Sequence, residues 1–205
     1  MNKQGILVSF EGIDGAGKSS LVEGICLRLK RPDVLSLREP GGTPVSEMIR
    51  ELLLDSRNQG ILSKTEALLY AAARNQVVEE IIAPALNEGK IVLIDRYIDS
   101  TIAYQGYGRG LDISFLEIVN QICTGGLKPD LTLLLDLDPL EGHKRKKKDI
   151  PDRLEKEGIS FQYRVRDGYL EIARKEAKRV KVLDAVQDRD SLVSKAMEYI
   201  QTILD

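Results

Sequence analysis

The stretch Gly12-Ile13-Asp14-Gly15-Ala16-Gly17-Lys18-Ser19 matches the pattern G-x-x-x-x-G-K-S of a phosphate-binding loop. A short apolar run at residues 6–10 precedes it and predicts a buried strand. After Ser19, apolar residues recur at helical spacing as far as Leu29. Strand, glycine loop and helix follow one another in the order that phosphate binding requires, which argues against an ordinary glycine-rich turn with a surface lysine.

The loop has a direct physical use. Glycines let the backbone turn tightly and aim successive N–H groups at one anion, and the following helix adds free N–H donors. Lys18 supplies a positive charge for the outer phosphates, and the Ser19 hydroxyl suits Mg²⁺. The sequence therefore predicts that MgATP binds at Gly12, Ile13, Asp14, Gly15, Ala16, Gly17, Lys18, Ser19 and Ser20.

Composition narrows the class of protein. The chain has 205 residues, 42% hydrophobic and 30% charged, which suits one soluble domain spanning residues 1–205. A net charge of −2 gives no basic excess for nucleic acid. No apolar run approaches the ~20 residues of a membrane helix, and the first strand begins too early for a signal peptide, so we expect a cytoplasmic protein without membrane contact.

Cysteine and histidine are too rare for several kinds of site. Cys26 and Cys123 both fall in apolar helical patterns, which favours buried free thiols in a reducing compartment. His143 is the single histidine. A cysteine metal site, a histidine metal cluster and a histidine-based catalytic triad are therefore not expected.

Five continuous apolar runs alternate with helical patterns and predict an α/β fold, a parallel sheet with helices on both faces. The runs are residues 6–10, 34–37, 91–94, 131–135 and 180–183. Ligands of such sheets bind at the carboxyl ends of the strands. The phosphate-binding loop, Arg38-Glu39 and Asp95-Arg96 all lie at such ends, so we expect them to converge on one cleft.

Helix signals lie between the strands. Ser63 and Glu66 have the spacing of a capping box, and they open a predicted helix that ends near Asn87. Residues 152–178 are predicted to form one long helix. Acidic residues are expected to cap three further helices, at Asp112, Asp138 and Asp190.

Asp95 and Arg96 follow an apolar strand and are candidates for chemistry. A carboxylate in this position of a P-loop enzyme holds Mg²⁺, directly or through water, so Ser19 and Asp95 are the predicted metal residues. Arg96 is able to bridge two anions with its planar fork, which suits transfer between phosphates, although a surface arginine after a strand is the simpler alternative.

Three further features have both a functional and a simple explanation. A carboxylate at Asp14 would repel nearby phosphates, so it needs a separate function there. Either it accepts a hydrogen bond from a sugar hydroxyl of a second substrate, or its side chain faces away from the site. Tyr70 and Arg74 share a helix face, where they either contact a base or lie at a solvated rim. The basic run at residues 144–148 is either a solvated face or a lid that closes over the triphosphate.

Taken together, these residues resemble the thymidylate kinase family, in the bacterial form with a basic lid. The resemblance runs nearly end to end. Besides the phosphate-binding loop it covers Arg38-Glu39-Pro40-Gly41-Gly42-Thr43, Leu69-Tyr70-Ala71-Ala72-Ala73-Arg74, Asp95-Arg96-Tyr97-Ile98-Asp99-Ser100, Ala103-Tyr104-Gln105-Gly106, Asp152-Arg153-Leu154-Glu155 and residues 161–173.

The resemblance implies a P-loop NTPase fold and transfer of the γ-phosphoryl group of MgATP to the 5′-phosphate of dTMP. It also implies a homodimer. The acceptor residues that it implies are Asp14 at the sugar 3′-hydroxyl, Glu39 near the loop and metal, Tyr70 stacked on the base, Arg74 on the thymine, Arg96 on the acceptor phosphate, Ser100 and Gln105 near the base, and Tyr104 at the 2′ position. Pro40 belongs to the same dTMP-binding set.

The lid, at about residues 143–153, departs from the family because lysines stand where relatives of this type tend to have arginines. Lysine carries the charge without the planar fork. Arg145, Lys147 and Arg153 are the candidates for the cation that meets the transition state, alongside Lys18 and Arg96 in the catalytic set.

Two other classes of protein compete with this interpretation. One is a P-loop kinase for a different nucleotide or for a deoxynucleoside, because the residues alone lead only to phosphoryl transfer onto a phosphate-bearing acceptor. The other is a nucleotide-gated protein of GTPase type, which usually carries an Asn-Lys-x-Asp motif that this chain lacks.

Overall fold

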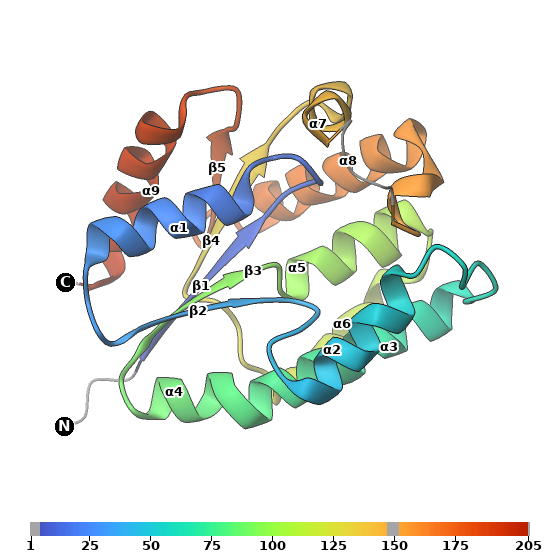
Figure 1. Cartoon of the computed structure of the whole chain (residues 1–205), viewed down its shortest axis with the longest axis horizontal. Helices are drawn as coiled ribbons and strands as arrows, with labels where there is room; N and C mark the ends of the chain where they lie inside the picture. Colours follow the sequence, from blue (N-terminus) through green and yellow to red (C-terminus); the bar gives the residue numbers. More distant parts are fainter. Residues whose placement is uncertain (1–4, 147–151, 205) are drawn as a thin grey trace.

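The computed structural model describes residues 5–146 and 152–204 (Figure 1). One parallel sheet has the strand order β2-β3-β1-β4-β5. The strands are β1 (Ile6–Glu11), β2 (Val34–Arg38), β3 (Ile91–Asp95), β4 (Leu131–Asp136) and β5 (Val180–Asp184). The predicted α/β fold is confirmed, and each strand runs one residue further than its apolar run, ending on a charged residue at the carboxyl edge.

Helices cover both faces of this sheet. The α-helices are α1 (Lys18–Leu29), α2 (Pro44–Leu54), α3 (Ser63–Val77), α4 (Ala83–Asn87), α5 (Ile98–Thr101), α6 (Ile113–Thr124), α7 (Pro139–Lys146), α8 (Ile159–Lys175) and α9 (Arg189–Leu204). Two π-helical segments, η1 (Val78–Ile82) and η2 (Ile102–Gly108), and one 3₁₀ turn, η3 (Glu155–Glu157), join them. Helices α1 and α9 pack on one face, and α4 and α8 on the other (Figure 1).

The core lies between the sheet and these helices. Phe10, Leu93 and Leu133 on the three central strands are completely buried, as is Ile25 of α1. Burying side chains of this size stabilises the fold by roughly 1.5–3 kcal/mol each. The central strands thus form a rigid base for the polar residues at their carboxyl ends. Among the helices of the described part, none is long and apolar enough to cross a bilayer.

The predicted capping box at Ser63 and Glu66 is wrong. Leu62 precedes the first turn of α3 and no side chain caps it. The Glu66 side chain is instead completely buried, where it binds Gln105 of η2 and Arg153. The predicted end of this helical region at Asn87 is confirmed, although η1 interrupts the regular α-helix.

Two other helix predictions need correction, and one helix was missed. Residues 152–178 do not form one helix, because Gly158 takes a left-handed φ of 84° between η3 and α8. Asp188, and not Asp190, accepts the Ser191 N–H at the start of α9. The helix formed by α5 and η2 was not predicted at all. Asp112 and Asp138 do act as predicted, because each accepts a backbone N–H in the first turn of its helix.

The cysteine prediction is partly right. Both thiols are free, and Cys123 is buried, but Cys26 is only half-buried.

Candidate active site

The phosphate-binding loop turns from β1 into α1 as predicted. Gly12, Gly15 and Gly17 have φ values of 138°, 77° and 96°, a region that side chains with a Cβ rarely adopt. A Cβ at Gly12 would lie 2.5 Å from the Leu135 carbonyl oxygen, so the loop also needs glycine for close packing. The backbone is therefore already shaped to surround an anion.

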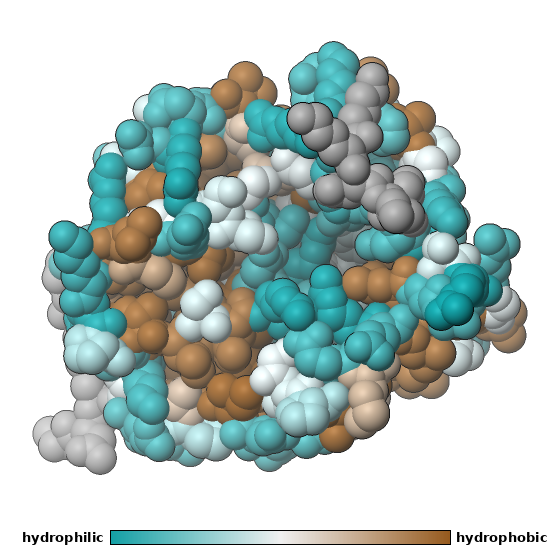
Figure 2. Space-filling view, viewed as in Figure 1, coloured by the Kyte–Doolittle hydropathy of each residue, from teal (hydrophilic) through white to brown (hydrophobic). Residues whose placement is uncertain are grey.

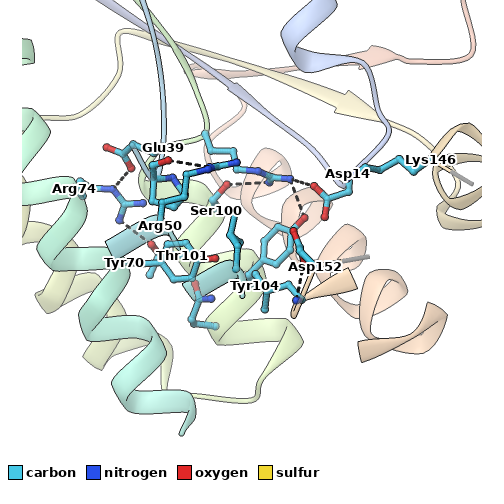
Figure 3. Close-up of a pocket in the computed structure, with 15 residues that line it drawn as sticks. Asp14, Glu39, Arg50, Tyr70, Arg74, Ser100, Thr101, Tyr104, Lys146 and Asp152 are labelled. Carbon is cyan, nitrogen blue, oxygen red and sulfur yellow. Dashed lines mark hydrogen bonds and ion pairs between the residues drawn. The ribbon is translucent and has the colours of Figure 1, made fainter. Parts of the chain in front are cut away.

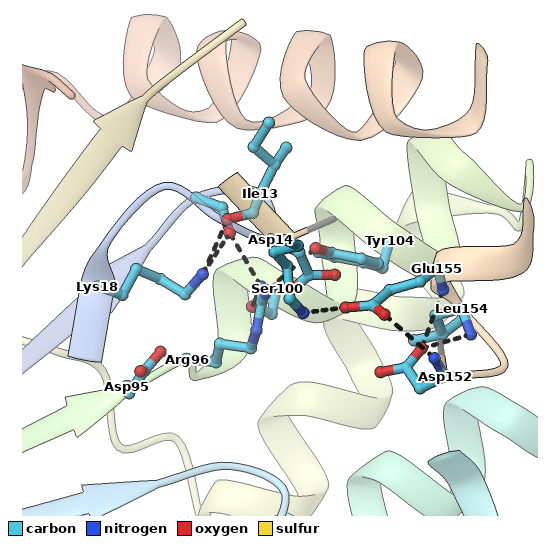
Figure 4. A network of polar contacts seen from close by, with 12 residues as sticks. Ile13, Asp14, Lys18, Asp95, Arg96, Ser100, Tyr104, Asp152, Leu154 and Glu155 are labelled. Atoms are coloured by element: carbon cyan, nitrogen blue, oxygen red, sulfur yellow. Dashed lines mark hydrogen bonds and ion pairs between the residues drawn. The ribbon is translucent and has the colours of Figure 1, made fainter. Parts of the chain in front are cut away.

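Lys18 lies at the start of α1 and is nearly buried. Its Nζ donates to the carbonyl oxygens of Gly12 (3.1 Å) and Ile13 (3.0 Å) (Figure 4). Burial and the neighbouring Arg96 lower the pKa of Lys18 to about 8. The ammonium is thus held against its own loop in an environment that favours the arrival of negative charge.

Ser19 and Asp95 meet beside the loop. The Ser19 Oγ donates to the Asp95 Oδ2 at 2.7 Å, which joins the first turn of α1 to the end of β3. A hydroxyl and a carboxylate side by side are oxygen ligands of the kind that Mg²⁺ prefers, and Mg²⁺ usually keeps few protein ligands and several waters. These two residues fit a magnesium ion held partly by nucleotide phosphates.

Arg96 is held in an unusual backbone conformation. Its φ is 72°, one of two non-glycine residues with a positive φ in the described part of the chain, and its N–H donates to the Phe10 carbonyl oxygen. Such strain persists where the surroundings over-determine it, commonly at functional sites. The guanidinium donates to Asp14 Oδ1 (2.6 Å), Gly12 O (3.0 Å), Tyr104 OH (3.1 Å), Tyr169 OH (3.1 Å) and Ser100 Oγ (3.3 Å).

Asp14 faces inward and pairs with Arg96, so the alternative that it points away is excluded. Burial favours its neutral form, but Arg96, Lys18 and Lys146 outweigh that effect and lower the pKa of Asp14. A carboxylate that stays ionised accepts hydrogen bonds only. Asp14 can therefore take a donor such as a hydroxyl from a ligand in the adjacent cavity.

Glu39 and Arg74 form a buried ion pair across the cavity, with 2.7 Å between Arg74 Nε and Glu39 Oε2. Arg74 also donates to Thr101 Oγ1, Asn120 Oδ1 and the Tyr97 carbonyl oxygen. Four of its five N–H groups are engaged in this way. Glu39 Oε1 is buried and has no hydrogen-bond partner in the described part of the chain.

One cavity collects the residues predicted for the acceptor (Figure 3). All nine line it: Asp14, Glu39, Pro40, Tyr70, Arg74, Arg96, Ser100, Tyr104 and Gln105. They come from the loop, the end of β2, α3, and the helical segment after β3. On the face shown in Figure 2, hydrophilic residues surround a hollow in the middle of the molecule.

Arg50 and Lys146 also line this cavity, and sequence reasoning missed both as individual residues. Arg50 donates to the Pro40 carbonyl oxygen at 2.9 Å. It lies in α2, where the sequence pattern indicates an apolar face but gives no sign of a functional residue on the polar side. The spacing Pro40 to Arg50 carries no recognisable motif, so only the folded chain shows that the two meet.

A buried network supports Arg96 from behind. Glu11, at the end of β1, accepts from Ser100 Oγ (2.6 Å) and Tyr169 OH (2.9 Å), the same hydroxyls that accept from Arg96. Burial and the nearby charge of Asp99 raise the pKa of Glu11 to about 7. Sequence reasoning missed Glu11, which offers no signal beyond its place before the loop.

The three candidate lid cations differ in where the structure places them. Arg145, exposed on α7, reaches toward the loop, with Nη1 3.5 Å from Gly15 O and Nη2 3.0 Å from Ala185 O. Lys147 lies outside the described residues. Arg153 is buried elsewhere: it pairs with Glu66 at 2.7 Å and donates to Leu53 O. This geometry does not support the assignment of Arg153 to the triphosphate.

Known proteins match the chain along almost its whole length. A family model described as thymidylate kinase matches residues 10–196. The thymidylate kinase of Desulforudis audaxviator is 45% identical over 203 residues, which cover 98% of this chain and 92% of that protein. The thymidylate kinase of Finegoldia magna is 46% identical over 199 residues, covering 96% and 98%. A crystal structure of thymidylate kinase from Ehrlichia chaffeensis aligns with a TM-score of 0.79 and 35% identity, covering 97% and 99%.

A parallel sheet whose first strand leads through a glycine loop into a helix defines a P-loop nucleotide-binding protein, and the adjoining cavity gives it room for a second substrate. The sequence matches, which cover nearly the whole chain, then identify the family within this class. The chain belongs to the thymidylate kinase family.

Proposed function

We propose that this chain transfers the γ-phosphoryl group of MgATP to the 5′-phosphate of dTMP, giving dTDP, between the phosphate-binding loop and the cavity of Figure 3. Membership of the family carries the overall reaction, with ATP as donor and dTMP as acceptor. The observation that most supports the location is that nine predicted acceptor residues line one cavity beside the loop.

The donor binds along the loop. The backbone N–H groups from Gly12 to Ser20 surround the β- and γ-phosphates, and the start of α1 points its positive end at them. Lys18 leaves its two carbonyl partners to meet the phosphates. Ser19 and Asp95 would hold Mg²⁺, which would neutralise phosphate charge when bound.

The acceptor binds in the cavity. The remaining N–H of Arg74 points to a thymine oxygen, and Tyr70 stacks on the base. Ser100 and Gln105 lie near the base, while Tyr104 fills the space of a 2′-hydroxyl and so favours deoxyribose. Asp14 accepts a hydrogen bond from the 3′-hydroxyl. Glu39 and Pro40 form the wall of the cavity on the side of the phosphate-binding loop.

The transfer needs no general base. The second pKa of a phosphate monoester is about 6, so the attacking oxygen of dTMP is largely ionised at neutral pH. The protein then has to bring two anions together and neutralise them. Arg96 serves both purposes, because it lies between the loop and the cavity and its planar fork can contact both phosphates.

The lid supplies a further cation. Arg145 is the candidate that the geometry favours, because its guanidinium already contacts the loop at Gly15. Lys147 remains a proposal from the sequence. Arg153 is less suited to this role, because it is buried and paired with Glu66.

We further propose that residues 1–205 act as one kinase domain, in the cytoplasm, without nucleic acid or membrane as a partner. A homodimer is supported by exposed apolar side chains on three neighbouring helices, α2, α3 and α6. They are Val45, Met48, Leu52, Leu68, Ile118 and Ile122. Exposed apolar side chains on neighbouring helices are typical of a contact between proteins when they form one patch.

The test is ADP release with MgATP and a panel of acceptors: dTMP, dUMP, UMP, CMP, AMP and thymidine. We expect strong turnover on dTMP, weaker turnover on dUMP and little on the others. Turnover on thymidine or on a ribonucleotide in place of dTMP would keep the ATP site and overturn the acceptor contacts. The same assay with Tyr104→Phe and Arg74→Lys then tests the acceptor cavity itself.

A further inference from the structure

Glu66 lies at the centre of a buried cluster that the reaction does not explain. Its side chain is fully buried in α3. The carboxylate accepts hydrogen bonds from Gln105 Nε2 (2.9 Å) and from Arg109 Nε (3.2 Å) and Nη2 (3.0 Å). It also forms an ion pair with Arg153 Nη1 at 2.7 Å. One carboxylate thus binds an amide and two guanidinium groups.

These partners come from two different parts of the active site. Gln105, in η2, lines the acceptor cavity. Arg153 is the last residue of the predicted lid. It is held at the end of α2 by its Nε, which donates to Leu53 O (2.7 Å), and by its backbone N–H, which donates to Leu54 O (3.2 Å). Glu66 therefore joins the wall of the acceptor cavity to the segment from Asp152 to Gly158, which we call the lid base.

The base of the lid also borders the cavity. Asp152 and Leu154 line it directly. Arg109 extends the cluster outward, with Nη1 2.6 Å from Glu157 in η3. On the loop side, Lys146 at the end of α7 pairs with Glu155. The segment from Asp152 to Glu157 is thus held between the cavity and the phosphate-binding loop.

The charge of Glu66 is needed, and not only its volume. Burial favours the neutral acid, but hydrogen bonds from Arg109 and Gln105 outweigh it and lower the pKa of Glu66. An ionised carboxylate only accepts, so it turns the NH₂ group of Gln105 toward itself and fixes the amide in the cavity wall. Removing the charge would leave Arg153, only 6% exposed, without its counter-charge.

We propose that Glu66 is a positioning residue that couples the acceptor cavity to the segment from Asp152 to Gly158, by holding Gln105 and Arg153 on one carboxylate. The proposal rests on the assignment of the cavity to dTMP. When dTMP contacts the cavity wall it restrains Gln105, and through Glu66 this restrains Arg153 and the residues after it. By reciprocity, an ordered lid base strengthens dTMP binding by the same free energy.

Hydrogen exchange with and without saturating dTMP tests the coupling in the intact chain. In the unsubstituted protein, we expect dTMP to slow amide exchange both in η2 and in the segment from Leu154 to Gly158. In Glu66→Gln, which keeps the shape and loses the charge, dTMP still slows exchange in η2. The slowing at the lid base falls to less than half.

Two further variants separate coupling from general stability. Arg153→Lys keeps the positive charge but breaks the same link from the other end, so dTMP should no longer slow exchange at the lid base. If Glu66→Gln does not fold, this variant alone tests the coupling. Ile200→Val, at a buried position of α9, is a destabilised control outside the cluster and keeps the full response. A structural role alone would raise exchange equally with and without dTMP.

The outcomes are distinct. An unchanged lid response in Glu66→Gln or Arg153→Lys overturns the coupling, and so does an unsubstituted protein in which dTMP slows exchange in η2 but not at the lid base. If dTMP binds without slowing exchange in η2, the acceptor cavity itself is wrongly assigned and the coupling falls with it.

Discussion

At the scale of single residues, Arg96 carries the largest share of the proposed chemistry. Its guanidinium is the positive group between two anions, and no other described side chain contacts both Asp14 and the Gly12 carbonyl oxygen. We expect Arg96→Ala to lower kcat by about 10²–10³, the usual effect of losing one group that stabilises transition-state charge. Steady-state kinetics with dTMP measure this. Arg174→Ala removes an exposed arginine of α8 and should leave kcat unchanged.

Burial, together with the charge of Arg96, lowers the pKa of Lys18, and this predicts how ATP binding depends on pH. The lysine pKa of about 8 is below its usual 10.5, so above pH 8 the free enzyme increasingly holds a neutral Lys18. Phosphates favour the ammonium, so binding there takes up a proton and the KM for ATP rises from pH 7 to pH 9.

Calorimetric titration of ATP at pH 8.5, in two buffers of different ionisation enthalpy, measures the proton uptake. We expect uptake in the unsubstituted protein and none from this group in Lys18→Ala. Equal uptake in both proteins would mean that another group titrates and that the lysine is already charged.

At the scale of elements, helix α7 and the phosphate-binding loop are in close contact. A Cβ on Gly142 would lie 2.6 Å from the Asp14 carbonyl oxygen, so Gly142→Ala has to push α7 away from the loop. Because α7 carries Arg145, we expect a higher KM for ATP, together with a loss of about 1–3 kcal/mol in the free energy of unfolding.

Kinetics and thermal unfolding check this prediction. Gly60→Ala is the matched control, because a Cβ there meets nothing within 4 Å and its φ is not positive. If Gly142→Ala keeps the ATP affinity of the unsubstituted protein, the approach of α7 to the loop has no part in donor binding.

Elements with a regular apolar pattern were predictable, and those that depend on distant partners were not. The five strands are short apolar runs that few other structures accommodate, so their positions were right to within a residue. The helix of α5 and η2 lacks a 3.6-residue pattern, because its π-helical part shifts the period. Glu66 has the spacing of a cap, yet Arg109 and Arg153, far along the chain, draw its side chain inward.

The site was more predictable than the helices around it. Phosphate chemistry requires particular residues at fixed spacing, so the loop, Asp95 and Arg96 are visible in the sequence. Arg50 and Glu11 are not, because each reaches the site only through the packing of a helix or strand end. Arg153 is a different case: it was one of three lid cations considered for the triphosphate, and no sequence pattern indicates that it pairs with the buried Glu66.

At the scale of the whole molecule, helix α3 links the acceptor cavity to the surface proposed for the dimer. Tyr70 and Arg74 on one side of α3 line the cavity, while Leu68 on another side is 52% exposed. Helices α2 and α6 flank α3 and add exposed apolar residues, among them Met48 and Ile122 (Figure 1). A second copy seated here would bury these side chains and hold α3 from behind, so association and acceptor binding should depend on each other.

We therefore expect light scattering to give twice the chain mass of 22.9 kDa for the unsubstituted protein. Ile122→Glu places a charge in the proposed contact and should give a monomer, since burying an unpaired charge opposes association. Its KM for dTMP should rise more than its KM for ATP, because α3 faces the acceptor and the loop does not rest on it. Leu27→Glu, equally apolar and exposed but on α1, should remain a dimer with unchanged kinetics. A monomeric unsubstituted protein at micromolar concentration, or a dimeric Ile122→Glu, would remove this surface from the proposal and leave α3 to be held by the contacts within its own chain.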